Sequence, residues 1–411
     1  MTDVYVVGVG MTQFGRLLDR SVKSLTEEAV AQALSDAGAD KADIGAAYFA
    51  NTTQGVLEGQ HLVAGQMALR QMGFQGIPIT NVENACASAS TAFHLGVNAI
   101  RAGVTDVALA VGADKMYDDD KAKSFEIFDG AWDVHDVDGT LERMADMGAG
   151  VEPPDGVVTP NAKRSPFMDV YASFAKFHMK TFGSTQRQFA AVAAKNHRHS
   201  TKNPKAQYRD DISVDEVLAA RLISWPLTLP MCSPISDGAA AAILCSKDAM
   251  DRFADARPIR VCASVLGTGV DRKPEEVDKH ITHLAANKAY EQAGVGPDDM
   301  SVAEVHDATA FGEITQTENL GFCGFGEGGM AAELGDTSIG GRIPINPSGG
   351  LESKGHPIGA TGLGQIYELV TQLRGEAGAR QVDGARFAIA ENGGGIWGIE
   401  EASACVTILG R

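Results

Sequence analysis

Hydrophobic runs alternate with amphipathic stretches from the start of the chain. Residues 4–10 are mostly β-branched and apolar, which predicts a buried strand. A helix is expected next, with Ser24 as its N-cap and Gly38 as its end. Residues 44–51 then predict a second strand, and residues 61–72 a second helix. This strand–helix–strand–helix order is typical of an α/β fold.

A cysteine lies where the next predicted strand gives way to a helix. An extended run at residues 78–82 leads into Asn84-Ala85-Cys86-Ala87-Ser88, and apolar residues then recur at helical spacing over residues 90–102. Residues 106–112 form a continuous apolar run, as in strands that are buried on both faces. Cys86 is therefore expected at the junction between a strand and a buried helix.

The second half of the chain repeats the order of the first. The matching segments are residues 259–267 with 4–10, 302–306 with 44–51, 360–373 with the helix after Cys86, and 387–391 with 107–111. A duplicated βα unit with a shared core is the economical interpretation. Such a duplication leaves the faces where the halves meet available for a site.

One long segment does not fit the duplication. Residues 118–231 combine an acidic start, aromatic residues among Asp and Gly, and two amphipathic stretches at 167–182 and 185–199. This is too long for a loop and too irregular for a sheet layer, so we expect a helical insertion that covers the site. Phe125, Phe128 and Trp132 in it either shape an acyl pocket or only pack, and packing is favoured. The expected division is an N-terminal half of residues 1–117 plus 232–250, the insertion, and a C-terminal half of residues 251–411.

Charge and cysteine usage narrow the class of protein. The formal net charge of -18, with no compensating basic cluster, argues against binding to nucleic acid or an anionic membrane. The start of the chain lacks a signal-peptide pattern, and no apolar run approaches the ~20 residues that span a bilayer. The six cysteines show no spacing suited to zinc and are expected as free thiols. These features predict a cytoplasmic protein without a metal site.

Four polar or glycine-rich segments could carry chemistry. They are Asn84-Ala85-Cys86, Glu304-Val305-His306-Asp307, Gly355-His356-Pro357, and Glu391-Asn392-Gly393-Gly394-Gly395. A thiol at the start of a buried helix has its thiolate favoured by the helix dipole, and a neutral imidazole can take its proton. Each residue alone also fits a structural role, as a core thiol, a hydrogen-bonded histidine or a turn. Their corresponding places in a duplicated fold favour a cysteine nucleophile with a histidine base.

Together these segments resemble the thiolase superfamily, and within it the sterol-carrier-protein-type, lipid-transfer branch. The resemblance extends over essentially the whole chain, and Gly355-His356-Pro357-Ile358-Gly359-Ala360-Thr361-Gly362 is its most specific motif. It implies a five-layered αβαβα fold built from duplicated βαβαβαββ halves, usually as a homodimer. It also implies coenzyme A as substrate or product, and no tightly bound cofactor.

The resemblance assigns roles to individual positions. Cys86 matches the nucleophile that takes an acyl group from coenzyme A, and His356 the base that activates it. His306 matches a residue that replaces an asparagine of other thiolases and holds the thioester oxygen together with His356. The positions assigned to oxyanion or substrate binding are Gly394, Gly395 and Asp307.

One departure from the family affects the chemistry. Thiolases of this kind use a second cysteine as acid and base, and the two places where it occurs read Ala308 and Glu391 here. General acid–base help of this type is worth roughly 10² to 10⁴ in rate. Glu391 either replaces the missing group, with a pKa raised by burial, or only anchors a loop. Cys323 is a more remote substitute.

Three functions remain open from the sequence. The first is a thiolase-type acyltransferase that makes or breaks a C–C bond beside a CoA thioester, on a bulky lipid or steroid-type chain, through an acyl-Cys86 intermediate. The second is a retro-aldolase that cleaves a β-hydroxyacyl-CoA with an OB-fold, zinc-ribbon protein partner, although residues 308–311 lack the tyrosine associated with such enzymes. The third is a non-catalytic acyl-CoA or lipid-binding protein.

Overall fold

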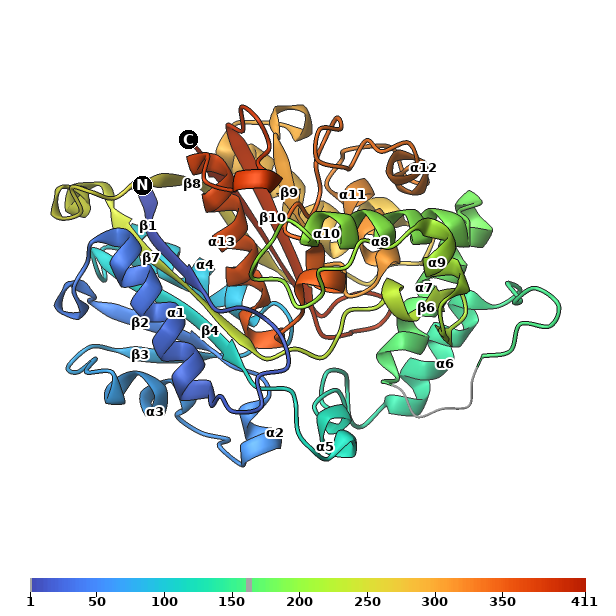
Figure 1. The fold of residues 1–411 in the computed structure, drawn as a ribbon, viewed down its shortest axis with the longest axis horizontal. Helices are drawn as coiled ribbons and strands as arrows, with labels where there is room; N and C mark the ends of the chain where they lie inside the picture. Colours follow the sequence, from blue (N-terminus) through green and yellow to red (C-terminus); the bar gives the residue numbers. More distant parts are fainter. Residues whose placement is uncertain (1, 160–164) are drawn as a thin grey trace.

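The computed structural model describes residues 2–159 and 165–411. Met1 and residues 160–164, which the sequence assigns to the N-terminal half and the insertion, lie outside the described residues. A nine-stranded sheet forms the centre of the molecule, in the order β3-β2-β4-β7-β1-β8-β11-β10-β9 (Figure 1). Its strands are β1 (Val4–Met11), β2 (Ala46–Ala50), β3 (Ile79–Val82), β4 (Val107–Asp114), β7 (Gly238–Ser246), β8 (Ile259–Gly267), β9 (Val302–Glu304), β10 (Phe387–Gly394) and β11 (Ser403–Gly410).

The sheet consists of two halves with the same pairing scheme. In the N-terminal half, β2 is parallel to β4, β4 is antiparallel to β7, and β7 is antiparallel to β1. In the C-terminal half, β9, β10, β11 and β8 repeat these relations in the same order. The halves meet where β1 pairs with β8, at Tyr5 with Arg260 and Val6 with Ile259. The predicted correspondence between the strands of the two halves is confirmed.

Helices cover the outer faces of the sheet and fill the space between its halves. They are α1 (Val22–Ala37), α2 (Gln54–Glu58), α3 (Ala64–Gln71), α4 (Ser88–Arg101), α10 (Ile281–Ala293), α11 (Ala310–Asn319), α12 (Gly328–Glu333) and α13 (Thr361–Arg374). Phe93 of α4 and Leu363 of α13 are fully buried in the central core, which also takes side chains from both halves of the sheet. A second core lies under α1, and a third under α10. The five layers are therefore α, β, α, β and α, as expected for a thiolase fold.

The first two predicted helices begin at other residues than expected. Ser21, not Ser24, caps α1: Ser21 Oγ accepts from Ser24 N at 3.2 Å, and Ser24 Oγ accepts from Ser21 N at 3.1 Å. The predicted end at Gly38 is correct, since this residue is left-handed, with φ at 63°. The second predicted helix begins later than expected, at Ala64, and is preceded by the short α2.

The segment predicted as an insertion is largely helical. Its elements are α5 (Lys121–Glu126), α6 (Val137–Gly148), α7 (Phe167–Phe182), α8 (Gln186–Ser200), α9 (Val214–Ala219) and the hairpin β5 (Leu222–Ser224) with β6 (Leu227–Thr228). The two amphipathic stretches correspond to α7 and α8. Phe189 of α8 packs edge-on against Phe311 of α11, with ring centroids 5.9 Å apart. The segment, green in Figure 1, therefore shares a core with the C-terminal half.

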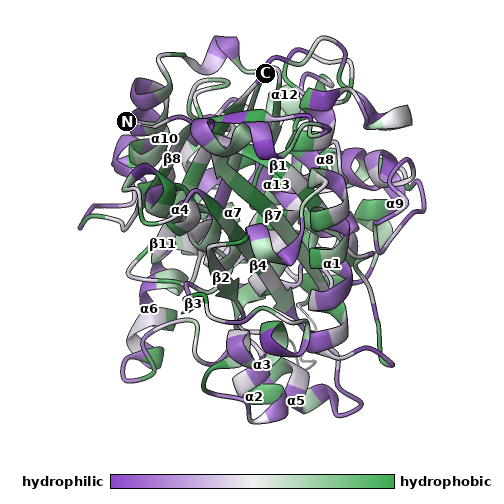
Figure 2. Ribbon diagram, turned by 90° about the vertical axis from the view of Figure 1, so that its left-hand side faces the viewer, coloured by the Kyte–Doolittle hydropathy of each residue, from purple (hydrophilic) through white to green (hydrophobic). Residues whose placement is uncertain are grey.

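Apolar residues are concentrated along the strands and the buried helix faces, and hydrophilic residues along the periphery (Figure 2). This distribution follows the alternation in the sequence. Across the two described stretches of the chain, no helix combines the length and the apolar content that crossing a bilayer would require.

Candidate active site

Cys86 lies on a sharp turn between β3 and α4. Ala85, the residue before it, has φ at 47°, a left-handed conformation that costs a non-glycine residue roughly 1–3 kcal/mol. Ser88 supports the turn, because its hydroxyl accepts from Asn84 N at 2.8 Å and donates to Ala85 O at 2.6 Å. The turn presents Cys86 to a large pocket at the start of the helix, as the sequence predicted.

The end of β10 presses against this turn. A Cβ on Gly394 would lie 2.3 Å from Asn84 O and 2.9 Å from Cys86 N, so only glycine fits there. Gly395 follows with φ at 67° and lines the same pocket. The structure thus brings both predicted glycines to Cys86, and it gives the glycine tract a steric reason.

Two histidines from the C-terminal half meet Cys86. One side-chain atom of each of Cys86, His306 and His356 lies within 4.8 Å of the others. The two imidazole rings are edge to face, with centroids 5.4 Å apart. His306 follows β9, and the backbone N of His356 is held by Ser236 Oγ at 2.9 Å.

Hydrogen bonds select the proton position on His356. Its Nδ1 lies 2.7 Å from Thr361 Oγ1, and this hydroxyl donates to Pro357 O at 3.0 Å. Because the hydroxyl proton is used on Pro357, Thr361 accepts from Nδ1–H, and the lone pair of the neutral ring is left on Nε2. This is the tautomer that a general base requires.

Burial sets the charge state of the site. It raises the pKa of Cys86 to about 12, with Asp114 adding to the effect. It lowers the pKa of His306 to about 4 and holds that of His356 well below its ordinary value. The resting site is therefore a thiol beside two neutral imidazoles. Burial outweighs the helix dipole that was expected to favour the thiolate, so the expected transfer of the thiol proton to a histidine base stays a prediction.

Asp307 does not occupy the substrate-facing position that the resemblance assigned to it. Its carboxyl group is fully buried and accepts from Leu351 N at 2.8 Å and from Asn196 Nδ2 at 3.1 Å. It does not line the pocket of Cys86 within the described residues. Leu351 belongs to the turn of helix that precedes His356. Asp307 therefore joins the two histidine-bearing segments.

Glu391 also lies behind the site. One carboxylate oxygen accepts from His306 N at 2.9 Å, and the other accepts from Thr282 Oγ1 at 3.3 Å. Burial, with the negative charge of Glu401, raises the pKa of Glu391 to about 8. Ala308 does line the pocket, whereas Glu391 and Cys323 are not among its described lining residues. The position of the missing second cysteine is thus a small apolar surface.

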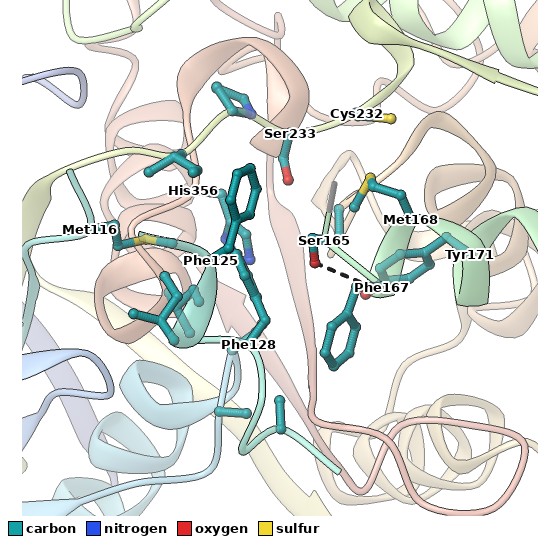
Figure 3. Close-up of a pocket in the computed structure, with 18 of the residues that line it drawn as sticks. Met116, Phe125, Phe128, Ser165, Phe167, Met168, Tyr171, Cys232, Ser233 and His356 are labelled. Atoms are coloured by element: carbon teal, nitrogen blue, oxygen red, sulfur yellow. Dashed lines mark hydrogen bonds between the residues drawn. The ribbon is translucent and has the colours of Figure 1, made fainter. Parts of the chain in front are cut away.

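The pocket in front of Cys86 has a volume of about 510 Å³ and a largely apolar wall that includes several aromatic side chains. Phe125 and Phe128 lie on one side of it, and Phe167, Met168 and Tyr171 of α7 on the other, with His356 deeper between them (Figure 3). Phe125 and Phe128 therefore line a pocket, whereas Trp132 packs, stacked on Phe167 with ring centroids 4.9 Å apart. Tyr171 was not predicted, because a tyrosine on an amphipathic helix carries no local sign of a site.

Comparison with known proteins assigns the family. The family model "Thiolase, N-terminal domain" matches residues 4–218, and "Thiolase C-terminal domain-like" matches residues 270–411. The chain belongs to the thiolase family. It is 38% identical to an acetyl-CoA acetyltransferase of Methanothermobacter thermautotrophicus over 100% of both chains. It is also 38% identical to human sterol carrier protein 2, over 95% of this chain and 69% of that protein.

Solved structures agree with this assignment. The structure titled "Ltp2-ChsH2(DUF35) aldolase" covers 100% of this chain and 98% of its own, with a TM-score of 0.78 at 24% identity. At this identity the likeness shows the fold. The predicted relation to thiolases of the sterol-carrier type is confirmed, and with it an acyltransferase of the thiolase family.

Proposed function

We propose that the protein transfers acyl groups through a thioester on Cys86. Nε2 of His356 takes the thiol proton as sulfur attacks the carbonyl carbon of an acyl-CoA. The observation that carries this proposal is the contact between His356 and Thr361, which leaves the basic nitrogen free beside Cys86. Proton transfer during the attack also makes a thiol with a raised pKa usable as a nucleophile, because no free thiolate has to form beforehand.

Two oxyanion sites fit around this nucleophile. The amide of Cys86 and the backbone at Gly394 and Gly395 lie together where the acyl-enzyme oxygen would form. His356 lies within 4.8 Å of the sulfur and would also hold the thioester oxygen of a second CoA substrate. These roles follow the family assignment and agree with the positions of the residues.

The substrate is proposed to be a bulky acyl-CoA of lipid or steroid type. A cavity of about 510 Å³ with largely apolar walls suits a large apolar group. Arg221 lies in the predicted insertion and is exposed where it lines the same cavity. In a chain with a net charge of -18, such a cation is a fitting partner for the phosphates of coenzyme A.

The direct test is to incubate the full chain with acetyl-CoA and with a long-chain acyl-CoA, and to weigh the intact protein. We expect a mass increase of one acyl group that maps to Cys86 and is lost in the Cys86→Ala variant. An unmodified wild-type protein with every acyl-CoA would refute acyl transfer. Unchanged ligand binding by Cys86→Ala, without any wild-type adduct, would support the non-catalytic alternative.

A retro-aldolase is the second candidate function. Tyr171 is the observation that favours it, since a half-buried tyrosine on the wall of the Cys86 pocket offers an acid that residues 308–311 lack. An OB-fold, zinc-ribbon protein is the partner proposed for this activity. Release of an aldehyde or ketone from a β-hydroxyacyl-CoA without added coenzyme A, with that partner present, is the test. Failure to release it would exclude this candidate.

A homodimer is proposed for the assembly. β3 is an edge strand of the sheet, and Leu62, Val63 and Met67 near it are exposed. An open edge beside apolar side chains is a surface that a second copy can cover. Light scattering should give twice the mass of one chain, and a Leu62→Asp, Met67→Asp variant should give the mass of one. A monomeric wild-type protein would contradict this.

A further inference from the structure

A second cavity borders His306. Its volume is about 80 Å³, enough for a few water molecules, and His306 and Tyr171 line both this space and the pocket of Cys86. Aromatic side chains form its apolar wall. Its polar wall contains carboxylates and histidines from four parts of the chain, His178, His280, Glu318, and Glu400 with Glu401.

Two of the carboxylates in this cavity are firmly paired. Glu318 lies 3.0 Å from His178 Nε2, and Glu400 lies 2.7 Å from Arg272 Nε. These pairs satisfy the charge of buried groups and fix the cavity walls.

Glu401 is held less tightly than its neighbours. Its Oε2 lies 3.3 Å from His280 Nε2 but makes no hydrogen bond with the described residues, and its Oε1 accepts a long bond of 3.4 Å from Gln316. His306 Nε2 is likewise buried and unpartnered among the described residues, although His306 is only 3% exposed. A carboxylate and an imidazole with unused hydrogen-bonding capacity thus line one small cavity.

We propose that His306 is the acid–base group that exchanges a proton with the substrate carbon next to the thioester, and that Glu401 stabilises its protonated form. This inference rests on the proposed acyl transfer at Cys86. His306 borders the reacting atoms on one side and Glu401's cavity on the other. It would do the work that a second cysteine does in related enzymes.

The reaction needs only acyl-Cys86 and a second CoA thioester, and the proton that is removed returns to the sulfur of Cys86. A ring nitrogen of His306 takes the α-proton of a second CoA thioester, and the C–H electron pair becomes an enolate. The enolate carbon bonds to the carbonyl carbon of acyl-Cys86, and the C–S bond breaks. The sulfur leaves as a thiolate and takes the proton from His306. The reverse sequence cleaves the C–C bond.

The charge states of the two residues fit these roles, with His306 as the base and Glu401 as the anion that stabilises its protonated form. Burial alone would raise the pKa of Glu401, but the neighbouring His280 outweighs it and lowers the pKa to about 2. Glu401 is therefore an anion at neutral pH, better suited to stabilise a cation than to take a proton. The negative charge of Glu401 raises the pKa of His306 and so counteracts part of the decrease that burial causes.

Glu391 is the rival for this role, and its contacts assign it another. Its carboxylate accepts from the backbone of His306 and from Thr282, and it lines neither cavity in the described structure. It is a positioning residue for His306. The titratable and charged groups around His306 and Glu401 are Cys86, Tyr171, His356, His280, Glu391, Glu400 with Arg272, and Glu318 with His178.

The test separates the two halves of the reaction in the full-length chain. Exchange of the α-protons of acetyl-CoA in D₂O reports on His306, and acylation of Cys86 by the same compound reports on His356. For Glu401→Gln we expect exchange at least about tenfold slower, and a lower apparent pKa in its pH profile. Acylation of Cys86 should continue. The matched control Glu318→Gln, which removes a carboxylate from the same cavity, should leave both rates unchanged.

Several results would overturn the inference. One is that Glu401→Gln exchanges the α-protons at the wild-type rate and with the wild-type pH profile. Another is that Glu401→Gln and Glu318→Gln both lose this exchange. A wild-type protein that acylates Cys86 but exchanges no α-proton would also do so. If Glu401→Gln does not fold, Glu401→Asp keeps the charge and should retain the wild-type profile, and a shifted profile would count against the proposal. Absence of Cys86 acylation in the wild type would instead refute the proposed function.

Discussion

The hydroxyl of Thr361 lies 2.7 Å from Nδ1 of His356 and donates a hydrogen bond to Pro357 O. This relationship fixes which nitrogen of His356 is basic. It depends on the first residue of α13, which lies five positions after the histidine, so the helix that fills the central layer also orients the base.

The Thr361→Val variant keeps the shape of this side chain and removes the acceptor. We expect acylation of Cys86 to slow about tenfold, the equivalent of ~1.4 kcal/mol for one hydrogen bond. The rate is measured as the first burst of coenzyme A release. Thr371→Val is the control on the same helix, because that hydroxyl bonds to Tyr367 O within α13. Equal effects of both variants would argue against a role in tautomer selection.

A methyl group at Gly394 should displace the turn that carries Cys86. The clash at 2.3 Å with Asn84 O involves backbone on both sides and has no easy relief. We expect the Gly394→Ala variant to lose acylation by at least about a hundredfold and to melt at a lower temperature. Gly267→Ala at the end of β8, where nothing lies within 4 Å of the added atom, is the control. Wild-type acylation by Gly394→Ala would contradict the packing argument.

The protonation state of Cys86 can be followed by alkylation. With a pKa near 12, the thiolate fraction is small at neutral pH and grows with every step upward. The rate of iodoacetamide modification at Cys86 should therefore rise about tenfold per pH unit from pH 7 to pH 9. Mass spectrometry of the Cys86 peptide gives the rate, and Cys86→Ala marks the background. A plateau within this range would reveal a thiolate at rest.

Glu391 should make stability depend on pH. Its pKa is about 8 in the folded chain against an ordinary value of 4.5, so the folded state holds this proton more tightly. The stabilisation is complete below pH 4.5 and is lost as the pH rises through 8. The Glu391→Gln variant should lack this part of the decline in the urea midpoint between pH 5 and pH 8. Parallel profiles for the variant and the wild type would show that Glu391 does not titrate there.

Arg221 is expected to act on binding alone. The Arg221→Ala variant should raise the KM for an acyl-CoA about tenfold, as for loss of one charge-assisted hydrogen bond, and leave kcat unchanged. Arg187, an exposed arginine of the same segment that pairs with Asp215, is the matched control. A KM effect of equal size in Arg187→Ala would indicate only a change in overall charge.

The sequence predicted the parts of the molecule whose signals are local or repeated. Continuous apolar runs located β1 and β4, and the repeat of strand order located β8, β9 and β10 and with them the two halves. Motifs at Cys86, His306 and His356 predicted that these residues meet, which the structure places within 4.8 Å. The extent to which burial raises the pKa of Cys86 could not be predicted, because burial depends on segments that pack around it from elsewhere in the chain.

Other features had no local signature. The left-handed Ala85 and the fit of Gly394 against Asn84 arise only when β10 meets the turn before α4. Tyr171 and Glu401 reach the site from an amphipathic helix and a loop, and each resembles an ordinary core or surface residue in sequence. For Asp307 the motif predicted contact with the substrate. In the structure its carboxyl group instead accepts hydrogen bonds from Leu351 N and Asn196 Nδ2 and joins the two histidine-bearing segments.

The seam between β1 and β8 has a consequence for the origin of the enzyme. Each half of the sheet is complete in its pairing, yet Cys86 comes from one half and both histidines from the other. A half-length ancestor would have held either a nucleophile or its base. Neither half alone therefore holds a complete pair, and the pairing of β1 with β8 fixes in one chain a geometry that separate halves could reach only by encounter.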